Sequence, residues 1–384
     1  MGEWKEYKWG DLATLEYGKG LRDYLRIDGK YPVFGTNGKI GTTDSFLCPH
    51  PSIIIGRKGA YRGVHFSSTP FYVIDTAFYL KPKTNHLDMR FAYYHLLTVD
   101  INYMDSGSAI PSTSRDDFYD LDILLPSLTK QKSIASILSS LDDKLDLLHR
   151  QNKTLEALAE TLFRQWFVEE AEEGWEIKSL FDVIELVGGG TPKTEVAEYW
   201  NGNIKWISAK DITPNHKGFI TETEKAITEL GLENSSAKLM PRYATVISAR
   251  GTVGKYCLLA KDMAFSQSNY GIKPRYKDCY FFTYLLVASS VDQLQAAAYG
   301  SVFDTITTNT FKEHKINAPK EAEIMSFEES IKPYFEKMLR NYEQIRTLTR
   351  LRDTLLPKLM SGEVRVKLPL TPSLTKEGER EIRG

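Results

Sequence analysis

A heptad pattern of apolar side chains runs from about residue 129 to residue 168, without interruption by Pro or Gly. Apolar residues recur there at alternating steps of three and four, which is the spacing of a coiled-coil helix. The seam consists of Ile134, Leu138, Leu141, Leu145, Leu148, Leu155, Ala159, Leu162 and Trp166, with Asn152 filling the remaining position. Such a helix cannot bury its seam alone, so the pattern predicts a helical partner.

The same rhythm returns near the C-terminus and supplies a candidate partner. It consists of Phe327, Ile331, Tyr334, Met338, Ile345, Leu348, Leu355 and Leu359, with Asn341 and Arg352 in polar positions. The offset is constant, because Ile331 lies as far beyond Leu138 as Leu355 lies beyond Leu162. Two unrelated heptad helices could agree by chance, but the similarity continues outside the helices. We therefore interpret the chain as a duplication.

Helix-breaking residues mark the second helix. Pro333 is expected to kink it or to start its main run near residue 330. Pro357 and Gly362 are expected to end it. The tail, residues 363–384, is polar and contains prolines, so we expect its end to be disordered.

Two segments with strand and turn signals precede the two helices. The predicted order is a globular domain over residues 1–127, a helix over 128–172, a second domain over 173–320 and a second helix over 321–362. Trp175 corresponds to Trp4 in the repeat. Arg250 in TVISARGTVGK corresponds to Arg57 in SIIIGRKGAYRG. The second copy carries extra residues, placed between residues 194 and 236. The fold class is therefore α+β, with two duplicated mixed α/β domains.

Composition describes a soluble globular protein, with 42% hydrophobic and 26% charged residues. The three cysteines are far apart, which suggests a reducing compartment and no structural zinc. The polar N-terminus and the lack of a long apolar run predict a cytoplasmic protein without a membrane span. A net charge of −1 counts against a DNA-binding domain that works alone, without excluding nucleic acid.

The sequence carries no recognisable catalytic or metal-binding motif. The sequence has no phosphate-binding GxxxxGK[ST] loop, no GxSxG nucleophile elbow, no HExxH and no Asn-Pro-Pro-aromatic motif. The histidines are scattered, and none pairs with a cysteine at metal-ligand spacing. We therefore expect no metal and no catalysis by this chain alone.

Basic and polar loops with aromatic residues are the remaining candidates for a binding site. Arg and Lys contact phosphates or guanine edges, and glycines allow a close approach of the backbone. The alternative is a solvated turn with a structural arginine. The candidate DNA contacts are Thr36, Asn37, Lys39, Arg57, Lys58, Tyr61, Arg62, Ser108, Thr113 and Arg115 in the first domain, and Thr191, Lys193, Ser208, Lys210, Arg250, Thr252, Lys255 and Ser301 in the second.

These motifs together resemble the specificity subunit of Type I restriction–modification enzymes. SIASILSSLDDKLDLLHRQNKTLEALAETLFRQWFV (133–168) is similar to that family's central conserved helix, and TLTRLRDTLLPKLMSGEVRV (347–366) to its distal one. GGGTP (188–192), WISAKDI (206–212) and ARGTVG (249–254) are similar to its target-recognition domains. The resemblance covers essentially the whole chain up to about residue 367.

The resemblance implies a non-catalytic reader of double-stranded DNA, in which each domain recognises one half of a bipartite site. It also implies that the two helices pack antiparallel in a pseudo-two-fold, cyclic arrangement and set the gap between the half-sites. Two methyltransferase subunits would dock on the helices, and a restriction/translocase subunit would join them. S-adenosylmethionine, ATP and Mg are then expected in the partner subunits and not in this chain.

An antiparallel pair with this offset has few possible registers. One of them sets Asn152 against Asn341. The neighbouring register faces Asn152 with Tyr334 and Asn341 with Leu145. A buried amide without a partner costs about 1–3 kcal/mol, so we predict the register that pairs the two asparagines.

Two other classes of function remain as alternatives. A cytoplasmic coiled-coil scaffold would join proteins without contacting DNA, although duplicated loops rich in Arg, Thr and Ser argue against it. A self-contained adenine methyltransferase is disfavoured because no cofactor loop and no catalytic Asn-Pro-Pro motif are present.

Overall fold

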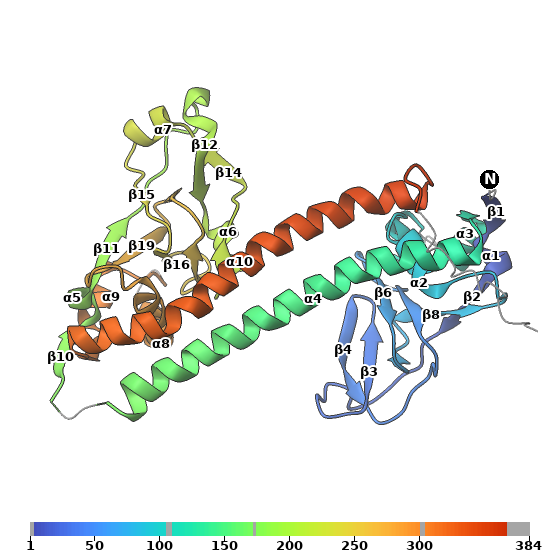
Figure 1. Ribbon diagram of the computed structural model, residues 1–384, viewed down its shortest axis with the longest axis horizontal. Coiled ribbons are helices and arrows are strands. Elements are labelled where there is room, and N and C mark those ends of the chain that lie inside the picture. Colours follow the sequence, from blue (N-terminus) through green and yellow to red (C-terminus); the bar gives the residue numbers. More distant parts are fainter. Residues whose placement is uncertain (1–3, 105–109, 172–173, 300–303, 367–384) are drawn as a thin grey trace, which may run out of the picture. The chain divides into compact units, whose positions relative to one another are not determined.

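The computed structural model describes residues 4–104, 110–171, 174–299 and 304–366 (Figure 1). The chain divides into two compact units, which are described separately. The first unit comprises Met1–Lys144 together with Leu348–Gly384, and the second comprises Leu145–Thr347. Each unit therefore combines a globular part with segments of both long helices.

The first unit contains short helices and three groups of strands. Its strands are β1 (Lys5–Lys8), β2 (Ala13–Tyr17), β3 (Tyr31–Gly35), β4 (Gly38–Thr43), β5 (Ser52–Gly56), β6 (Val64–Ser67), β7 (Tyr72–Val73), β8 (Ala77–Pro82) and β9 (Asp122–Leu125). Its short helices are α1 (Trp9–Leu12), α2 (Met89–Leu96), η1 (Ile101–Tyr103) and α3 (Arg115–Asp120). The sheets have the orders β2-β8-β5-β6 and β4-β3-β7, and β1 pairs with β9.

The second unit repeats this plan with additions. Its strands are β10 (Glu176–Ser179), β11 (Ile184–Gly188), β12 (Trp200–Ile207), β13 (Phe219–Ile220), β14 (Lys225–Ile227), β15 (Leu239–Met240), β16 (Thr245–Ser248), β17 (Tyr256–Leu259), β18 (Met263–Phe265), β19 (Asn269–Pro274) and β20 (Lys315–Ala318). Its shorter helices are α5 (Leu180–Val183), η3 (Ala197–Tyr199), α6 (Ala209–Ile212), η4 (Thr213–Asn215), α7 (Glu229–Glu233), α8 (Tyr280–Tyr299) and α9 (Thr308–Glu313). The sheets have the orders β11-β19-β16-β17-β13 and β14-β12-β18-β15, and β10 pairs with β20.

Strand order confirms the duplication. The series β11-β19-β16-β17 repeats β2-β8-β5-β6, and β14-β12-β18 repeats β4-β3-β7. The same parallel pair recurs, since β12 runs parallel to β18 as β3 does to β7. Among the described residues, β13, α7 and β15 have no counterpart in the first unit. The mixed sheets and helices confirm the predicted α+β class.

Two long helices connect these parts of the chain. Helix α4 spans Leu128–Arg164 and continues as a π-helical turn, η2 (Gln165–Glu169), and α10 spans Glu321–Met360. Of the two expectations for Pro333, the late start near residue 330 is wrong, because α10 begins at Glu321 and continues as α-helix through this residue. Pro333 is exposed, so water can satisfy the carbonyl of Glu329 that the missing N–H would have bonded.

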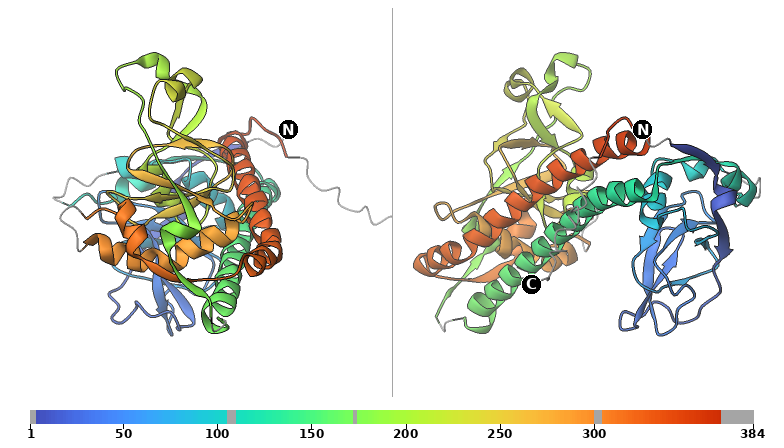
Figure 2. Two further views of the ribbon diagram at one scale, coloured as in Figure 1. Left: turned by 90° about the vertical axis from the view of Figure 1, so that its left-hand side faces the viewer. Right: turned by 45° about the vertical axis from the view of Figure 1, so that its right-hand side comes forward.

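The antiparallel register of the seam is visible within the second unit. Asn341 Nδ2 donates to Asn152 Oδ1 over 2.8 Å, and both side chains are buried. Farther along the seam, the rings of Trp166 and Phe327 lie 5.5 Å apart. Both pairs belong to the predicted register, and Figures 1 and 2 show the two helices side by side in this unit. The predicted pairing of the two asparagines is therefore confirmed.

Each helix also has a second apolar face, which the heptad pattern did not identify. Phe163 on α4 and Phe167 on η2 pack against Phe282 of α8, with ring centroids 5.8 and 5.2 Å apart. Phe335 on α10 stacks on Phe281 at 4.5 Å with an interplanar angle of 5°. These side chains join the main core of the second unit. Burial of an aromatic side chain stabilises by roughly 1.5–3 kcal/mol, so this face anchors the helices to the sheet layers.

In the first unit, an ion pair links the two helices to each other and to α2. Arg352 Nη1 lies 3.2 Å from Asp142 Oδ1, and the Tyr94 hydroxyl donates to Asp142 Oδ2 over 2.6 Å. Leu138 and Leu359 belong to the same core as the sheet residues of this unit. The core of the first unit is therefore completed by helix segments from distant parts of the sequence.

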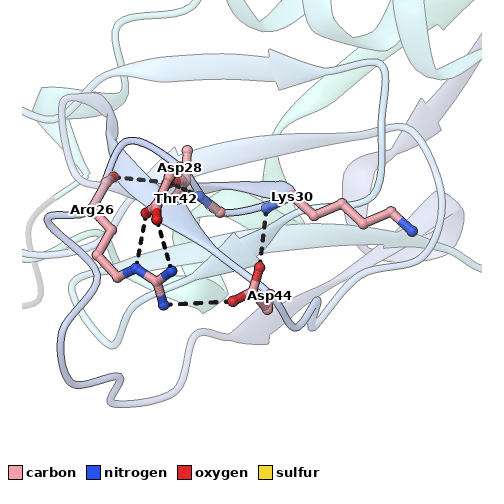
Figure 3. A network of polar contacts seen from close by, with 6 residues as sticks. Arg26, Asp28, Lys30, Thr42 and Asp44 are labelled. Atoms are coloured by element: carbon pink, nitrogen blue, oxygen red, sulfur yellow. Dashed lines mark hydrogen bonds and ion pairs between the residues drawn. The ribbon is translucent and has the colours of Figure 1, made fainter.

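A long loop between β2 and β3 is held along β4 by a polar network (Figure 3). Arg26 bonds Asp28 through two nitrogens and reaches Asp44, while the Thr42 hydroxyl donates to Arg26 O over 2.9 Å. Ile27 at the loop tip remains 95% exposed. The network explains how a loop without regular structure keeps one conformation beside the sheet.

The buried asparagine pair makes a prediction about stability. Asn341→Leu alone leaves Asn152 facing an apolar side chain and is expected to lower the free energy of unfolding by about 1–3 kcal/mol. Changing both asparagines to Leu is expected to recover most of this loss while loosening the register. Chemical denaturation of the single and double variants measures the first effect, and spin-label distances across the helix pair measure the second.

The exposed Gln344 on the same helix provides the control. Gln344→Leu is expected to leave stability nearly unchanged. Losses from the two single variants that simply add in the double variant would show that the two amides do not interact.

Candidate functional site

Four loops of the second unit meet at the ends of β11, β12, β16 and β18. Gly190 N donates to Phe265 O and Ser266 N donates to Ile207 O, each over 2.9 Å. Ala249 N donates to Ser268 O over 2.9 Å. Main-chain hydrogen bonds therefore hold the four loops together.

These loops enclose a polar cavity of 340 Å³, lined by Thr191, Trp206, Ser208, Ala209, Lys210, Glu224, Lys225, Ser266, Gln267 and Ser268. Three of the predicted contacts, Thr191, Ser208 and Lys210, are thus brought together. The Thr191 hydroxyl donates to the Gln267 carboxamide oxygen. Ser208 has a structural task as well, because its hydroxyl and N–H both bond the Asp211 carboxylate. Gln267 and Lys225 were not predicted from the sequence, because neither lies in a recognisable motif.

The remaining predicted contacts of this unit lie on neighbouring loops. Arg250, Thr252 and Lys193 are exposed, and Lys255 is partly exposed. Lys255 N donates to Thr252 O over 3.2 Å, which closes the turn that carries Arg250. Ser301 lies outside the described residues.

The first unit builds the same kind of loop edge. Arg57 N donates to Thr76 O over 2.9 Å, and Gly59 N donates to Pro111 O over 2.9 Å. The Thr36 hydroxyl bonds both Lys58 O and Thr76 O, so it connects the β3–β4 turn to these loops. The Thr36 hydroxyl is thus engaged in hydrogen bonds that hold the loops together.

Exposed candidates surround this edge. Asn37, Lys39, Lys58 and Tyr61 are exposed. Asn37 and Tyr61 also line a cavity of 540 Å³ that extends to the end of α2. Ser108 lies outside the described residues.

Two predicted DNA contacts of the first unit are buried. Arg62 is 2% exposed, and its Nη2 donates to the carbonyls of Ile101, Asn102 and Met104. Thr113 is 4% exposed, and its hydroxyl donates to Gly56 O over 2.8 Å. The prediction is wrong for these two residues, because their polar groups hold the loop from inside and are not available to a ligand at the surface.

The hydrogen bonds also correct the correspondence between the two basic loops. In the first unit, Arg57 N and Lys58 N both donate to Thr76 O. In the second unit, Ala249 N and Arg250 N both donate to Ser268 O. Arg250 therefore corresponds to Lys58, and the counterpart of Arg57 is Ala249. The sequence alignment was shifted by one residue, because it matched the two arginines. The two turns have the same length, since Gly56 N donates to Gly63 O and Ser248 N donates to Lys255 O.

Arg57 and Arg115 come together over one ring in the first unit. Their guanidinium carbons lie 4.8 and 5.2 Å from the centroid of the Tyr17 ring. Arg115 also bonds the Tyr119 hydroxyl through Nη2 over 2.9 Å, and this contact raises the pKa of its guanidinium. Tyr17 carried no signal in the sequence, because it is the last residue of an ordinary amphipathic strand.

The two edges combine cations, hydroxyls and amides, which can donate to phosphates and to the edges of bases. Within the described ranges, no cluster of His, Cys, Asp and Glu could hold a metal ion. No helix among the described residues is long and apolar enough to cross a membrane. Cys48, Cys257 and Cys279 are buried and form no disulfide. The arrangement is that of a binding surface.

Comparison with known proteins identifies the class. A family model described as Type I restriction modification DNA specificity domain matches residues 1–157 and 172–340. The chain belongs to this family, which is the class that its resemblance predicted.

Its relatives are specificity subunits. The MjaIX specificity subunit of Methanocaldococcus jannaschii is 25% identical over 285 residues, covering 69% of this chain and 65% of that protein. The HindI specificity subunit of Haemophilus influenzae is 25% identical over 376 residues, covering 76% of this chain and 81% of that protein. The match to the archaeal protein thus spans just under two thirds of its length.

A crystal structure of a Type I restriction–modification S subunit from M. genitalium has the same fold. It aligns with a TM-score of 0.69 at 19% identity, covering 93% of this chain and 96% of that one. The shared architecture of duplicated domains and long helices is thus established by a solved structure.

The basic loops lead to a prediction about DNA binding. Arg57→Ala and Arg250→Ala are each expected to weaken DNA binding by the assembled complex. A lost contact to a base edge costs about 1–3 kcal/mol at one position, whereas a lost phosphate contact lowers affinity for all sequences and flattens the salt dependence. Binding measured at several salt concentrations distinguishes the two.

Arg242→Ala provides the matched control. Arg242 is exposed and stacks on Tyr243 in the second unit, before β16 and away from the loop edge. It is expected to bind DNA as the wild type does. If the arginines of the loops are only structural, their variants will melt at lower temperature and still bind normally.

Proposed function

We propose that this chain selects the DNA sequence for a Type I restriction–modification complex, and that each unit reads one half of a bipartite, asymmetric target. The observation that carries this proposal is the repeated loop edge. Both units bring the ends of corresponding strands together by corresponding main-chain bonds, yet they present different side chains there. A shared scaffold with different contacts is what two independent half-site readers require.

Differences between the two units support an asymmetric target. The second unit adds β13, α7 and β15, and its polar cavity is lined by Gln267 and two lysines. The cavity of the first unit is lined by Asn37, Tyr61 and the end of α2. Two such surfaces present different donors and acceptors, so they favour different bases.

The net charge of −1 fits a reader that does not hold DNA alone. Most of the affinity of a protein for DNA comes from neutralised phosphates, and this chain has no overall surplus of cations. We infer that partner subunits enclose the DNA and contribute much of the binding energy. The local cations of the two loop edges then orient the duplex.

Exposed apolar side chains on the long helices support docking of partners. Leu147 and Leu158 are 40% and 42% exposed in the second unit, and Ile137 and Leu351 are 36% and 45% exposed in the first. We infer that two methyltransferase subunits dock on the helices, that a restriction/translocase subunit joins them, and that the helix register sets the spacing of the half-sites. S-adenosylmethionine, ATP and Mg would bind to those partners, and this chain would take no part in the chemistry.

Coexpression with the methyltransferase subunit tests the proposed function. Methylated adenines mapped genome-wide are expected to fall in one bipartite, asymmetric sequence. A scaffold without DNA contact would instead give no selective methylation and no salt-dependent gel shift.

A domain exchange tests independent reading. Replacing residues 1–127 with the corresponding domain of another family member is expected to change one half of the methylated sequence and leave the other unchanged. The matched exchange of residues 173–320 is expected to change the other half. A change of both halves by either exchange, or of neither, would contradict independent reading.

A further inference from the structure

Three side chains of the first unit form a compact group at the loop edge. Arg57 and Arg115, which we call the arginine pair, both contact the ring of Tyr17. The guanidinium carbons lie 4.8 and 5.2 Å from the ring centroid. Tyr17 is 48% exposed, so the group lies at the surface. It comes from the end of β2, the loop after β5 and the first turn of α3, and only the fold brings these segments together.

Each member of the group is held in orientation. Arg57 Nη1 donates to Asp75 O over 3.0 Å, and its guanidinium carbon also lies 5.7 Å from the Phe78 ring. Arg115 bonds the Tyr119 hydroxyl, which itself accepts from Leu15 N over 3.0 Å. Guanidinium groups that are held by hydrogen bonds and by contact with aromatic rings lose little further entropy when they bind a planar ligand. The arginine pair is therefore preorganised for binding.

The positive charges of Arg57 and Arg115 are not neutralised by a carboxylate among the described residues. Among the described residues, neither Arg57 nor Arg115 forms an ion pair with a carboxylate, although other arginines such as Arg26 and Arg352 do. Both cations approach the same ring, so they repel each other. Most of the N–H groups of Arg57 point to no acceptor within the described part of the chain. A ligand rich in acceptors would satisfy both groups.

The second unit lacks the whole group. The counterpart of Tyr17 is Gly188. Tyr17 pairs with Phe78 across the β2–β8 ladder, and Gly188 pairs with Tyr270 at the same place in the β11–β19 ladder. Arg57 corresponds to Ala249 by its backbone bond, and Arg115, the first residue of α3, corresponds to Thr308, the first residue of α9. By contrast, the exposed cation Lys58 is retained as Arg250. The shared cation suits the phosphates that any duplex presents, whereas the group found in one unit alone suits a sequence-specific contact.

The geometry points to a guanine-reading site in the first unit, an inference that rests on the proposed function. Arg57 and Arg115, positioned by Tyr17, donate to the O6 and N7 acceptors of guanine in the first half-site. The planar fork of arginine matches these two acceptors, and this is the commonest specific contact in the major groove. A phosphate can also be bound by a point charge, which exposed lysines such as Lys19 and Lys58 can supply. Tyr17 acts here as a positioning residue.

The test uses the complex of the full chain with its methyltransferase partner and a DNA library in which both half-sites are randomised. Arg57→Lys keeps the charge but loses the fork, and Tyr17→Leu removes the ring. Each is expected to reduce the preference for guanine at one position of the first half-site by roughly 10- to 100-fold. Selection in the second half-site is expected to stay as in the wild type.

Two further variants separate positioning from simple stability. Tyr17→Phe keeps the ring and is expected to retain the preference for guanine, and Arg250→Lys in the second unit is expected to leave the first half-site unchanged. Melting temperatures of all variants accompany the selection. If Tyr17→Leu does not fold, the comparison of Arg57→Lys with Arg250→Lys still decides the question.

Each other outcome overturns the inference in a recognisable way. Equal loss of affinity for every sequence, with a flatter salt dependence, would assign the pair to phosphates. Unchanged selection by Arg57→Lys and Tyr17→Leu would remove the pair from recognition while leaving the proposed function intact. A wild-type complex that selects no bipartite sequence would contradict the proposed function itself, and the inference with it.

Discussion

The buried seam between α4 and α10 is the constraint on which the rest of the structure depends. The first unit is discontinuous in sequence, and both units contain segments of both long helices. Leu138 and Leu359 complete the core of the first unit, while Phe163 and Phe335 complete that of the second. A change of register would therefore alter both cores. The Asn341–Asn152 hydrogen bond makes one register better than its neighbours, since any other would bury an amide without a partner.

The loop edges follow a second constraint, which is the need to hold irregular backbone in one conformation. Main-chain bonds such as Ser266 N to Ile207 O tie the loops to the strand ends. Several polar side chains serve the same purpose, among them Thr36, Arg62 and Thr113. Because these internal contacts define the loops, the outward-facing residues can differ between the two units without loss of the fold. The scaffold and the surface of each loop edge are thus separate features of the fold.

The arginine pair and the polar cavity show how far the two units have diverged. The first unit presents two guanidinium groups over the Tyr17 ring, whereas the second presents Gln267 bonded to Thr191. Arginine forks favour guanine, and carboxamides favour adenine. Two copies of one domain thus offer different chemistry at equivalent edges, which is consistent with an asymmetric target for the proposed reader.

The sequence by itself determined the two long helices, the duplication, the register and the family, because heptad periodicity and repeated motifs are local patterns that need no knowledge of distant contacts. It did not exclude a late start of the second helix near residue 330, whereas α10 begins at Glu321 and includes the exposed Pro333. Only the tertiary structure decided that Arg62 is buried and that Lys58 is the counterpart of Arg250. It alone also showed that Tyr17 lies beneath Arg57 and Arg115, because these segments meet only through the strand pairing and loop contacts of the folded chain.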